Sequence, residues 1–293
     1  MKVKTFKSVL AMTLACLIWG LSGLYYDQLS HIEPFEVLAH RALWAMLFFS
    51  VVLFFQGRFI GLIKGLGSSR EAVLLACSSL MISINWFFFI FSIQTGQAVQ
   101  ASFGYYIFPL VAVIFGYVFK GERFSRIQIF AILCAVCSIV ALGFALRLVP
   151  TISLIIAFTF GAYGLIKSFI KLSSIESVTI ETMVLAPVAL SFLFFKYAVQ
   201  DQENHTAIWS DLLLLMVSGL ITGGPLILFA FATQNISYAT VGILQYINPT
   251  LQFLVATFIL LEPFNTWHAF ALVFIWIGII IYSGESWRLE LRR

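Results

Sequence analysis

Charged side chains are scarce in this protein. Its 293 residues include 17 Lys and Arg and 13 Asp and Glu, which together make up 10% of the chain, whereas they make up roughly 25% of a soluble domain. With 61% hydrophobic residues, the chain has too little polar surface to cover itself in water. Basic residues occur singly or in small groups between apolar runs, which argues against nucleic acid as a partner. The composition therefore excludes a water-soluble globular protein.

Long polar stretches are also absent. The longest breaks between apolar runs, residues 57–70 and 200–210, are too short to hold a soluble domain. The sequence has no phosphate-binding Gly-rich loop, which excludes ATP hydrolysis as an energy source. All of the function is therefore expected to lie within the membrane.

Ten apolar runs are long enough to cross a bilayer. About 20 apolar residues span the hydrocarbon core as a helix, which satisfies every backbone donor and acceptor internally. The runs cover approximately residues 7–26, 34–56, 71–94, 97–119, 126–146, 149–170, 177–199, 211–233, 237–261 and 265–284. The predicted fold class is an all-α polytopic membrane protein with ten transmembrane helices.

Positive charges are distributed unevenly between the ends of these runs. If the N-terminus is cytoplasmic, 14 of the 17 Lys and Arg lie on the cytoplasmic side, Arg147 and Lys196 lie outside, and Arg41 falls within the second run. Positive charge is retained in the cytoplasm during insertion, so both termini are predicted to be cytoplasmic. Lysines before the first run also suit a secretory signal, but no cleavage site follows at a sensible distance. We interpret that run as a retained first span.

The two halves of the chain match at offsets of 140 and 141 residues. The matching segments share tyrosine, proline, glutamate or glycine at equivalent positions. They are Tyr106-Ile107-Phe108-Pro109 with Tyr246-Ile247-Asn248-Pro249, Glu122 with Glu262, and Gly20-Leu21-Ser22-Gly23 with Gly161-Ala162-Tyr163-Gly164. Chance similarity among apolar helices is the alternative explanation. We predict two five-helix repeats, residues 1–147 and 148–293; because five is odd, the second is inverted, as in secondary transporters.

His40 and Arg41 are ionisable residues well inside the second run. They lie about 10 Å from its outer end at 1.5 Å per residue, and a charged side chain at that depth normally faces a cavity or a partner. Arg41 could bind a carboxylate through two parallel hydrogen bonds. The structural alternative is that Arg41 extends to the interface or pairs with Asp27, Glu33 or Glu36.

Glu181 is the other acidic residue well inside a run. A buried carboxyl group that gains and loses a proton could couple proton movement to substrate binding. An ion pair with Lys167 or Lys171 is the structural alternative.

Polar and aromatic residues interrupt three otherwise apolar runs. The candidates for substrate contact among them are Asn85, Trp86, Tyr105, Tyr106, Gln245, Tyr246 and Asn248. Aromatic faces and amides suit an amphipathic organic ligand, although each residue alone also suits an interhelical hydrogen bond. Pro109 and Pro249 each free a carbonyl within a run and are candidate kinks or gates. Glu122 and Glu262 are expected at the ends of these spans, where helix capping or turn contacts are the leading explanation and direct coupling is the alternative.

Two further motifs are open to a catalytic or metal-binding interpretation. Ser22, in Gly20-Leu21-Ser22-Gly23, could be the nucleophile of an intramembrane serine hydrolase with His40 or His268 as base, but close helix packing explains the small residues better. Cys134 and Cys137 lie within one span without further ligands. We expect no catalytic residue, no metal site and no cofactor.

Motifs along nearly the whole chain resemble the RarD family. They are His40-Arg41, Asn85-Trp86, Ser102-x-Gly104-Tyr105, Pro109-Leu110, Gly121-Glu122-Arg123, Tyr163-Gly164-Leu165, Glu181-Thr182, Pro225-Leu226 and Gly242-x-x-Gln245-Tyr246-x-x-Pro249-Thr250-Leu251. The resemblance implies an EamA-domain permease of the drug/metabolite transporter superfamily, in the bacterial inner membrane, of a kind named for chloramphenicol sensitivity or resistance. One departure is Phe108, where the family usually has asparagine, while the equivalent position of the second half carries Asn248.

The function expected from these observations is secondary transport by alternating access. The cargo would be a small amphipathic metabolite such as an amino acid, with export as the expected direction and chloramphenicol efflux as a property implied by the resemblance. The expected partners are that small molecule and the lipid bilayer. A proton or another coupling ion and the oligomeric state are left open. A serine hydrolase using Ser22 and a non-transporting membrane partner or sensor are the alternatives.

Overall fold

Helices are the only regular elements in the described part of the protein. The computed structural model describes residues 2–59, 62, 69–121, 124–146, 150–200, 205–233 and 244–290. The helices are α1 (Lys2–Gln28), α2 (Pro34–Phe55), α4 (Ser69–Gln94), α5 (Ala98–Lys120), α6 (Arg126–Leu146), α7 (Thr151–Lys167), α8 (Ser174–Phe195), α9 (His205–Thr233), α11 (Ile247–Leu254) and α12 (Thr266–Glu290). Two π-helical segments, η1 (Lys196–Gln200) and η2 (Val255–Ile259), follow α8 and α11.

Each predicted run coincides with one of these helices. The ninth run is described from residue 244 onward, where α11 and η2 follow one another. Six helices, namely α1, α2, α4, α5, α8 and α9, are long and apolar enough to cross a membrane. The described parts of the other four contain shorter apolar helices. The predicted all-helical polytopic fold is confirmed at this level, whereas the count of ten spans stays a prediction.

Local sequence signals set the start of the two helices that carry buried charges. α2 begins at Pro34, whose fixed φ suits a first turn and whose missing N–H has no partner to lose there. α8 begins with a capping box, in which the Ser173 hydroxyl accepts from the Glu176 N–H and the Glu176 carboxylate accepts from the Ser173 N–H. These starts fix the positions of Arg41 and Glu181 along α2 and α8.

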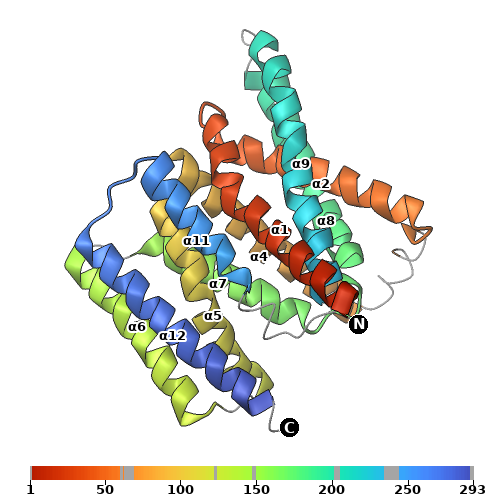
Figure 1. The fold of residues 1–293 in the computed structure, drawn as a ribbon. Helices are drawn as coiled ribbons and strands as arrows, with labels where there is room; N and C mark the ends of the chain where they lie inside the picture. Colours follow the sequence, from red (N-terminus) through yellow and green to blue (C-terminus); the bar gives the residue numbers. More distant parts are fainter. Residues whose placement is uncertain are drawn as a thin grey trace.

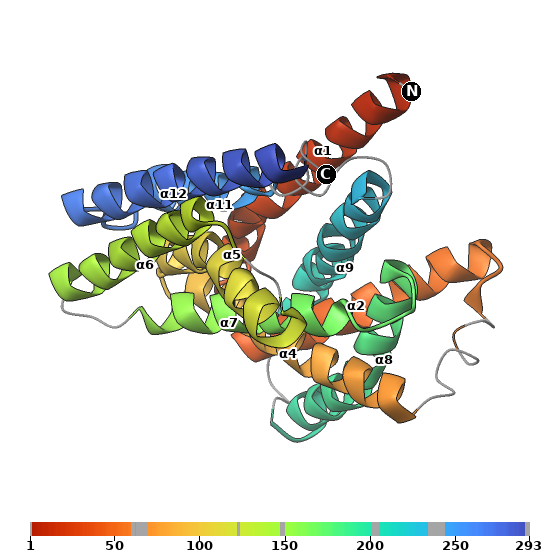
Figure 2. The same cartoon turned by 90° about the horizontal axis from the view of Figure 1, so that it is seen from below.

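The helices pack as a bundle in which most neighbours are distant in sequence. α6 and α12 lie side by side along one edge of the molecule in both views (Figures 1 and 2). Elsewhere α2 packs against α8 and α9, α1 against α9 and α11, α4 against α7 and α8, and α5 against α7 and α11. α4 also contacts both α1 and α2. Side chains from these three helices therefore meet in the interior.

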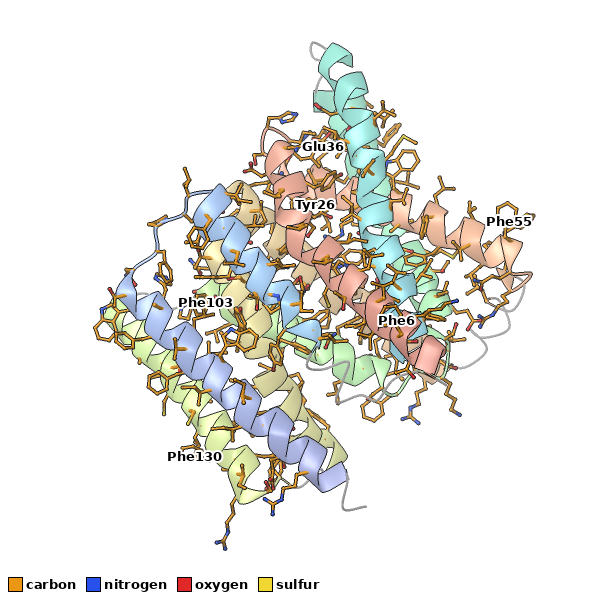
Figure 3. The ribbon with its side chains drawn as sticks, viewed as in Figure 1. Phe6, Tyr26, Glu36, Phe55, Phe103 and Phe130 are labelled. Atoms are coloured by element: carbon orange, nitrogen blue, oxygen red, sulfur yellow. The ribbon has the colours of Figure 1, made fainter. Side chains whose placement is uncertain are left out.

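Aromatic residues occupy both the interior and the outer surface of this bundle. Tyr26 and Phe103 belong to the buried core, whereas Phe6, Phe55 and Phe130 project outward from their helices (Figure 3). Phe55 is 82% exposed. An outer surface this rich in large apolar side chains requires lipid as its solvent.

Small residues allow α2 and α9 to approach each other closely. A Cβ atom added at Gly219 would lie 2.5 Å from the backbone carbonyl carbon of Trp44, and one at Gly223 would lie 2.4 Å from the Phe48 ring. Backbone atoms cannot move aside as a flexible side chain can, so the contact at Gly219 has no room for a methyl group.

Gly219→Ala is therefore expected to destabilise the protein by about 1–3 kcal/mol, because the methyl group would push α2 away from α9. The matched control is Gly224→Ala in the same helix, where nothing lies within 4 Å of the added Cβ. That control should be neutral or stabilise the helix by up to about 1 kcal/mol. Thermal denaturation in detergent measures both variants, and equal midpoints for the two would contradict the prediction.

Candidate functional site

Arg41 is buried in the interior of the bundle without a counter-ion among the described residues. Its side chain comes from α2 and is 6% exposed. The guanidinium carbon lies 4.3 Å from the ring centre of Trp86 in α4 and 5.4 Å from that of Tyr26 in α1. Nε and Nη1 are buried and have no acceptor for their N–H groups among the described residues. Two aromatic faces thus stabilise a charge whose buried N–H groups have no acceptor.

None of the three acidic residues expected as structural partners pairs with Arg41. Asp27 is exposed and forms no ion pair with a described residue, and Glu33 and Glu36 are engaged elsewhere. Glu33 and Glu36 both bind Lys196, with N–O distances of 2.9 and 2.8 Å. Tyr197 donates a hydrogen bond to Glu36. The geometry therefore gives no support to the alternative in which Glu33 or Glu36 neutralises Arg41.

His40 faces this acidic cluster and not the surroundings of Arg41. Its Nε2 lies 3.1 Å from the Tyr197 hydroxyl, which in turn donates to Glu36. His40 and Arg41 are adjacent in sequence, yet they project toward different sets of partners because successive residues of a helix are rotated by about 100°. His40, Tyr197, Glu36, Glu33 and Lys196 are called the α8-end cluster below.

Asn85 and Tyr105 join helices α4, α5 and α7. The Asn85 amide donates to the Ile156 carbonyl at 3.0 Å and to the Thr159 hydroxyl at 3.3 Å, and it accepts from the Tyr105 hydroxyl at 3.0 Å. These bonds use both donors and the acceptor of the amide. These hydrogen bonds hold α4, α5 and α7 together. Asn85 is the residue directly before Trp86 in α4.

A second polar and aromatic group joins α5 to α11 and α12. The Tyr106 hydroxyl donates to Thr250 at 2.9 Å, and the Trp276 ring lies near both Tyr106 and Tyr246. Asn248 accepts from the Gln252 amide at 3.1 Å. Gln245 is half-buried one residue before Tyr246. The structure thus pairs Arg41 with Trp86 and Asn85 with Tyr105, and it brings Tyr106 and Tyr246 to the same Trp276 ring. Asn248 and Gln245 are not joined to either set by a described side-chain contact.

Glu181 forms the ion pair that the structural alternative predicted. One carboxylate oxygen accepts from Lys167 at 3.0 Å and from the Ser78 hydroxyl at 2.7 Å, and the other accepts from the Tyr163 hydroxyl at 3.1 Å. Lys167 also contacts the Ser177 hydroxyl. Glu181 is 1% exposed, so α4, α7 and α8 are joined by a buried and fully compensated charge.

Glu262 caps a helix, as its sequence position suggested. Its two carboxylate oxygens accept from the backbone N–H groups of Ala98 and Val99, at the start of α5. Burial raises the pKa of this carboxyl, and the two backbone hydrogen bonds oppose the rise. Glu262 thus fixes the end of a helix from the other half of the chain. The equivalent Glu122 lies outside the described residues.

The two prolines differ in their helical context. Pro109 lies within α5 (Ala98–Lys120), whereas Pro249 lies in the first turn of α11, just after the helix is interrupted at Tyr246. Pro249 lacks the N–H that would otherwise bond the Gln245 carbonyl. The interruption occurs where a proline kink was expected, and a gating role stays a prediction.

Ser22 has the environment of a packing residue. Its hydroxyl donates to the Trp19 carbonyl at 2.6 Å. A Cβ atom at the neighbouring Gly20 would lie 2.6 Å from Leu251, so the small residues allow α1 to approach α11. Cys134 and Cys137 are both free cysteines. Over the residues that the structure describes, no group of three or more His, Cys, Asp and Glu is placed to hold a metal.

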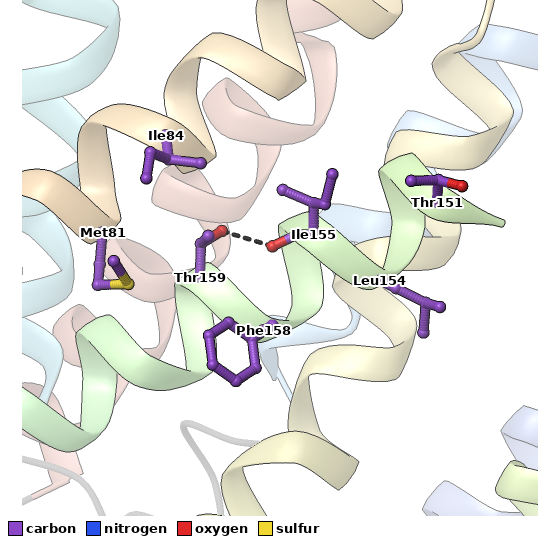
Figure 4. Close-up of a pocket in the computed structure, with 7 residues that line it drawn as sticks. All are labelled: Met81, Ile84, Thr151, Leu154, Ile155, Phe158 and Thr159. Carbon is purple, nitrogen blue, oxygen red and sulfur yellow. Dashed lines mark hydrogen bonds between the residues drawn. The ribbon is translucent and has the colours of Figure 1, made fainter.

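An open groove of about 400 Å³ lies between α4 and α7. Its lining residues are Met81, Ile84, Thr151, Leu154, Ile155, Phe158 and Thr159 (Figure 4). The Thr159 hydroxyl is bonded to the Ile155 carbonyl at 2.7 Å, so it offers little to a ligand. An open apolar groove of this kind suits an acyl chain better than a polar substrate.

The sequence did not single out Tyr26, Lys196, Tyr197 or Ser78. Tyr26 lies near the end of the first run, where aromatic residues are common as interfacial anchors. Lys196 and Tyr197 likewise lie at the end of a run. Only the contacts between helices give these residues their partners.

Comparison with known proteins identifies the class to which this arrangement belongs. The model of the EamA-like transporter family matches residues 6–144 and 149–284. The uncharacterized transporter YojE of Bacillus subtilis is 36% identical over 97% of both chains. Protein RarD of Escherichia coli is 34% identical over 97% of this chain and 96% of its own. A protein of known crystal structure, 18% identical over 98% of this chain and 99% of that one, superposes with a TM-score of 0.64, a likeness of fold alone.

The chain belongs to the EamA-like transporter family. It is a multi-pass membrane protein and a transporter or permease of the EamA and RarD type. The resemblance to RarD seen in the sequence is confirmed, and a serine hydrolase is not favoured.

Proposed function

We propose that the protein exports a small amphipathic metabolite, such as an amino acid or a related compound, across the bacterial inner membrane by secondary transport. In this proposal ten spans form two inverted EamA-type repeats, residues 1–147 and 148–293, with both termini in the cytoplasm. Alternating access then arises because each half can adopt the arrangement of the other.

The observation that carries the proposal is the pattern of helix contacts. If the halves are exchanged, α1, α2, α4, α5 and α6 take the places of α7, α8, α9, α11 and α12. The contact of α5 with α7 then becomes that of α11 with α1, α2 with α9 becomes α8 with α4, and α1 with α9 becomes α7 with α4. Two tandem matches to one family model also support a repeat.

The two halves also share equivalent charged positions. The 140-residue offset relates Glu36 to Glu176 and Arg41 to Glu181. Glu36 binds Lys196 beyond the end of α8, while Glu176 binds Arg58 beyond the end of α2 at 2.8 Å. An ion pair therefore ties α2 to α8 at each end of the pair. Arg58, Ser173 and Glu176 form the α2-end cluster, in which Arg58 also donates to Ser173.

Breaking one of these clusters is expected to favour opening on its own side of the membrane. Accessibility is measured with an impermeant thiol reagent that labels a Tyr105→Cys reporter. Arg58→Met should increase labelling of this reporter from the α2-end side, and Lys196→Met should increase its labelling from the α8-end side. The background lacks the 4 native cysteines. Identical labelling of the two variants from each side would contradict the prediction.

A substrate gradient or a coupling ion would drive transport. His40 and Glu181 are the candidates for proton coupling. His40 is the stronger, because imidazole titrates near neutral pH and Glu181 is already compensated by Lys167.

Drug export is an incidental property in this proposal. One relative, 28% identical over 96% of this chain, is named chloramphenicol-sensitive protein RarD, from Pseudomonas aeruginosa. The name describes a phenotype of that protein. It does not identify a cargo for this one.

The direct test is flux in proteoliposomes that contain the purified protein alone. Labelled amino acids, their derivatives and chloramphenicol are screened with and without a pH gradient, and His40→Gln is compared with wild type. Saturable flux supports a carrier. Flux that responds to the gradient in wild type but not in His40→Gln supports proton coupling through His40. Ligand binding without any flux would favour the non-transporting sensor or partner.

A further inference from the structure

We infer that the cargo is an organic anion with an apolar body and that its negative group pairs with Arg41. This inference rests on the proposed function, since it specifies the substrate of the same site. It narrows the proposed cargo: among amino acids and related compounds it selects anionic derivatives and excludes the zwitterionic amino acids themselves, and it also excludes neutral compounds as the preferred cargo.

Arg41 carries a buried positive charge that no described residue pairs with. A guanidinium buried at membrane depth is costly unless an anion or a set of acceptors compensates it. Among the described residues Nε and Nη1 have no acceptor, and Glu33 and Glu36 are bound to Lys196. An anionic ligand would supply the missing partner.

The aromatic contacts of Arg41 do not use its Nε and Nη1 hydrogen-bond donors. Trp86 and Tyr26 lie near the guanidinium carbon through their rings. Nε and Nη1 have no acceptor among the described residues, so their N–H groups are available to a planar carboxylate, which an arginine can bind through two parallel bonds. Trp44, one helical turn along α2 from Arg41, has a buried indole N–H that is also without an acceptor.

The equivalent position in the other half argues against a zwitterion. A zwitterion would need an uncompensated acid to pair with its ammonium group. Glu181 is the acidic counterpart of Arg41 at the 140-residue offset, but Lys167 neutralises it at 3.0 Å. The Lys167–Glu181 pair is neutral as a whole, and Arg41 keeps a positive charge that no described residue pairs with, which matches a monoanion.

The aromatic side chains around Arg41 indicate which kind of molecular body the cargo has. Tyr26 and Trp86 belong to one apolar core cluster with Phe89, against which Tyr105 is packed. Aromatic faces of this kind favour an apolar or aromatic body over a sugar or a polar chain. Neutral chloramphenicol has no negative charge to pair with Arg41.

The test compares acids with their neutral amides. Benzoate, 3-phenylpropionate and indole-3-acetate are each paired with the corresponding primary amide, and phenylalanine serves as the zwitterion. Flux is measured in proteoliposomes, and binding to the purified protein is measured by calorimetry. We expect wild type to prefer at least one acid over its amide by about 30-fold, the equivalent of about 2 kcal/mol. Arg41→Gln should lose that preference, and Arg41→Lys should retain part of it.

The outcomes separate this inference from the proposed function. Saturable flux with equal preference for acids and amides, or with preference for phenylalanine, would overturn the anion and leave the carrier intact. Absence of flux and binding for the whole panel would count against both. A ligand-free measurement gives an independent check, because Arg41→Gln should raise the thermal midpoint of the empty protein if Arg41 awaits a ligand. A fall in that midpoint would identify Arg41 as a structural residue and overturn the inference.

Discussion

Replacing Arg41 with glutamine is expected to reduce substrate flux through the protein by about 30-fold or more while leaving the protein folded. The estimate follows from the loss of one partner in a desolvated charge pair, which typically costs 2–5 kcal/mol. Folding should persist because the wild-type guanidinium forms no ion pair with the described residues. Glutamine retains an N–H donor without the charge.

The matched control for this variant is Arg126→Gln, which removes an exposed arginine at the start of α6. Flux and elution from a size-exclusion column are compared for the two variants and the wild type. The control should behave as wild type in both measurements. Full flux through Arg41→Gln would remove Arg41 from the transport path, and aggregation of that variant would point to a structural role.

Lys167→Met is expected to destabilise the protein by about 3–5 kcal/mol, because it leaves the carboxylate of Glu181 buried without its cation. Glu181 is 1% exposed, and the bonds from Ser78 and Tyr163 remain. Two hydroxyl groups do not replace a positive charge at this depth. Thermal denaturation in detergent measures the loss.

The double variant Lys167→Met/Glu181→Gln should recover most of this stability, since neither charge then remains buried alone. Flux through the double variant distinguishes the two roles considered for Glu181. Normal, gradient-sensitive flux would make the pair structural, whereas flux that no longer responds to pH would assign proton coupling to Glu181. A double variant as unstable as Lys167→Met would contradict the ion-pair explanation.

The helices and their order could be predicted from the sequence because they depend on local properties. A run of about 20 apolar residues must close its own backbone hydrogen bonds in lipid, whatever its neighbours are. Pro34 and the Ser173–Glu176 capping box add local start signals. Family membership was also readable, since motifs such as His40-Arg41 and Asn85-Trp86 keep their order along the chain.

The partners of the buried polar residues were only partly predictable. The sequence offered two lysines, Lys167 and Lys171, as partners of Glu181, because both come shortly before it in the chain, across a short loop. It did not show which of the two forms the ion pair. The partners of Arg41 were not found, since Tyr26 and Trp86 lie on other helices. The charge relation between Arg41 and Glu181 was also missed, because a search for identical residues passes over opposite charges at equivalent positions.

The order of the amino acids is enough to show a helical membrane protein, the positions of its helices along the chain and its membership of a transporter family. Which side chains meet depends on how the helices pack: the aromatic faces around Arg41, the compensation of Glu181 and the two clusters that join α2 to α8. Hydrophobicity does not reveal the packing, because a helix such as α2 is apolar on nearly all sides. Apolar side chains can face lipid as well as protein neighbours. Hydrophobicity therefore fixes that a segment spans the membrane, while close packing selects the face that meets its neighbours.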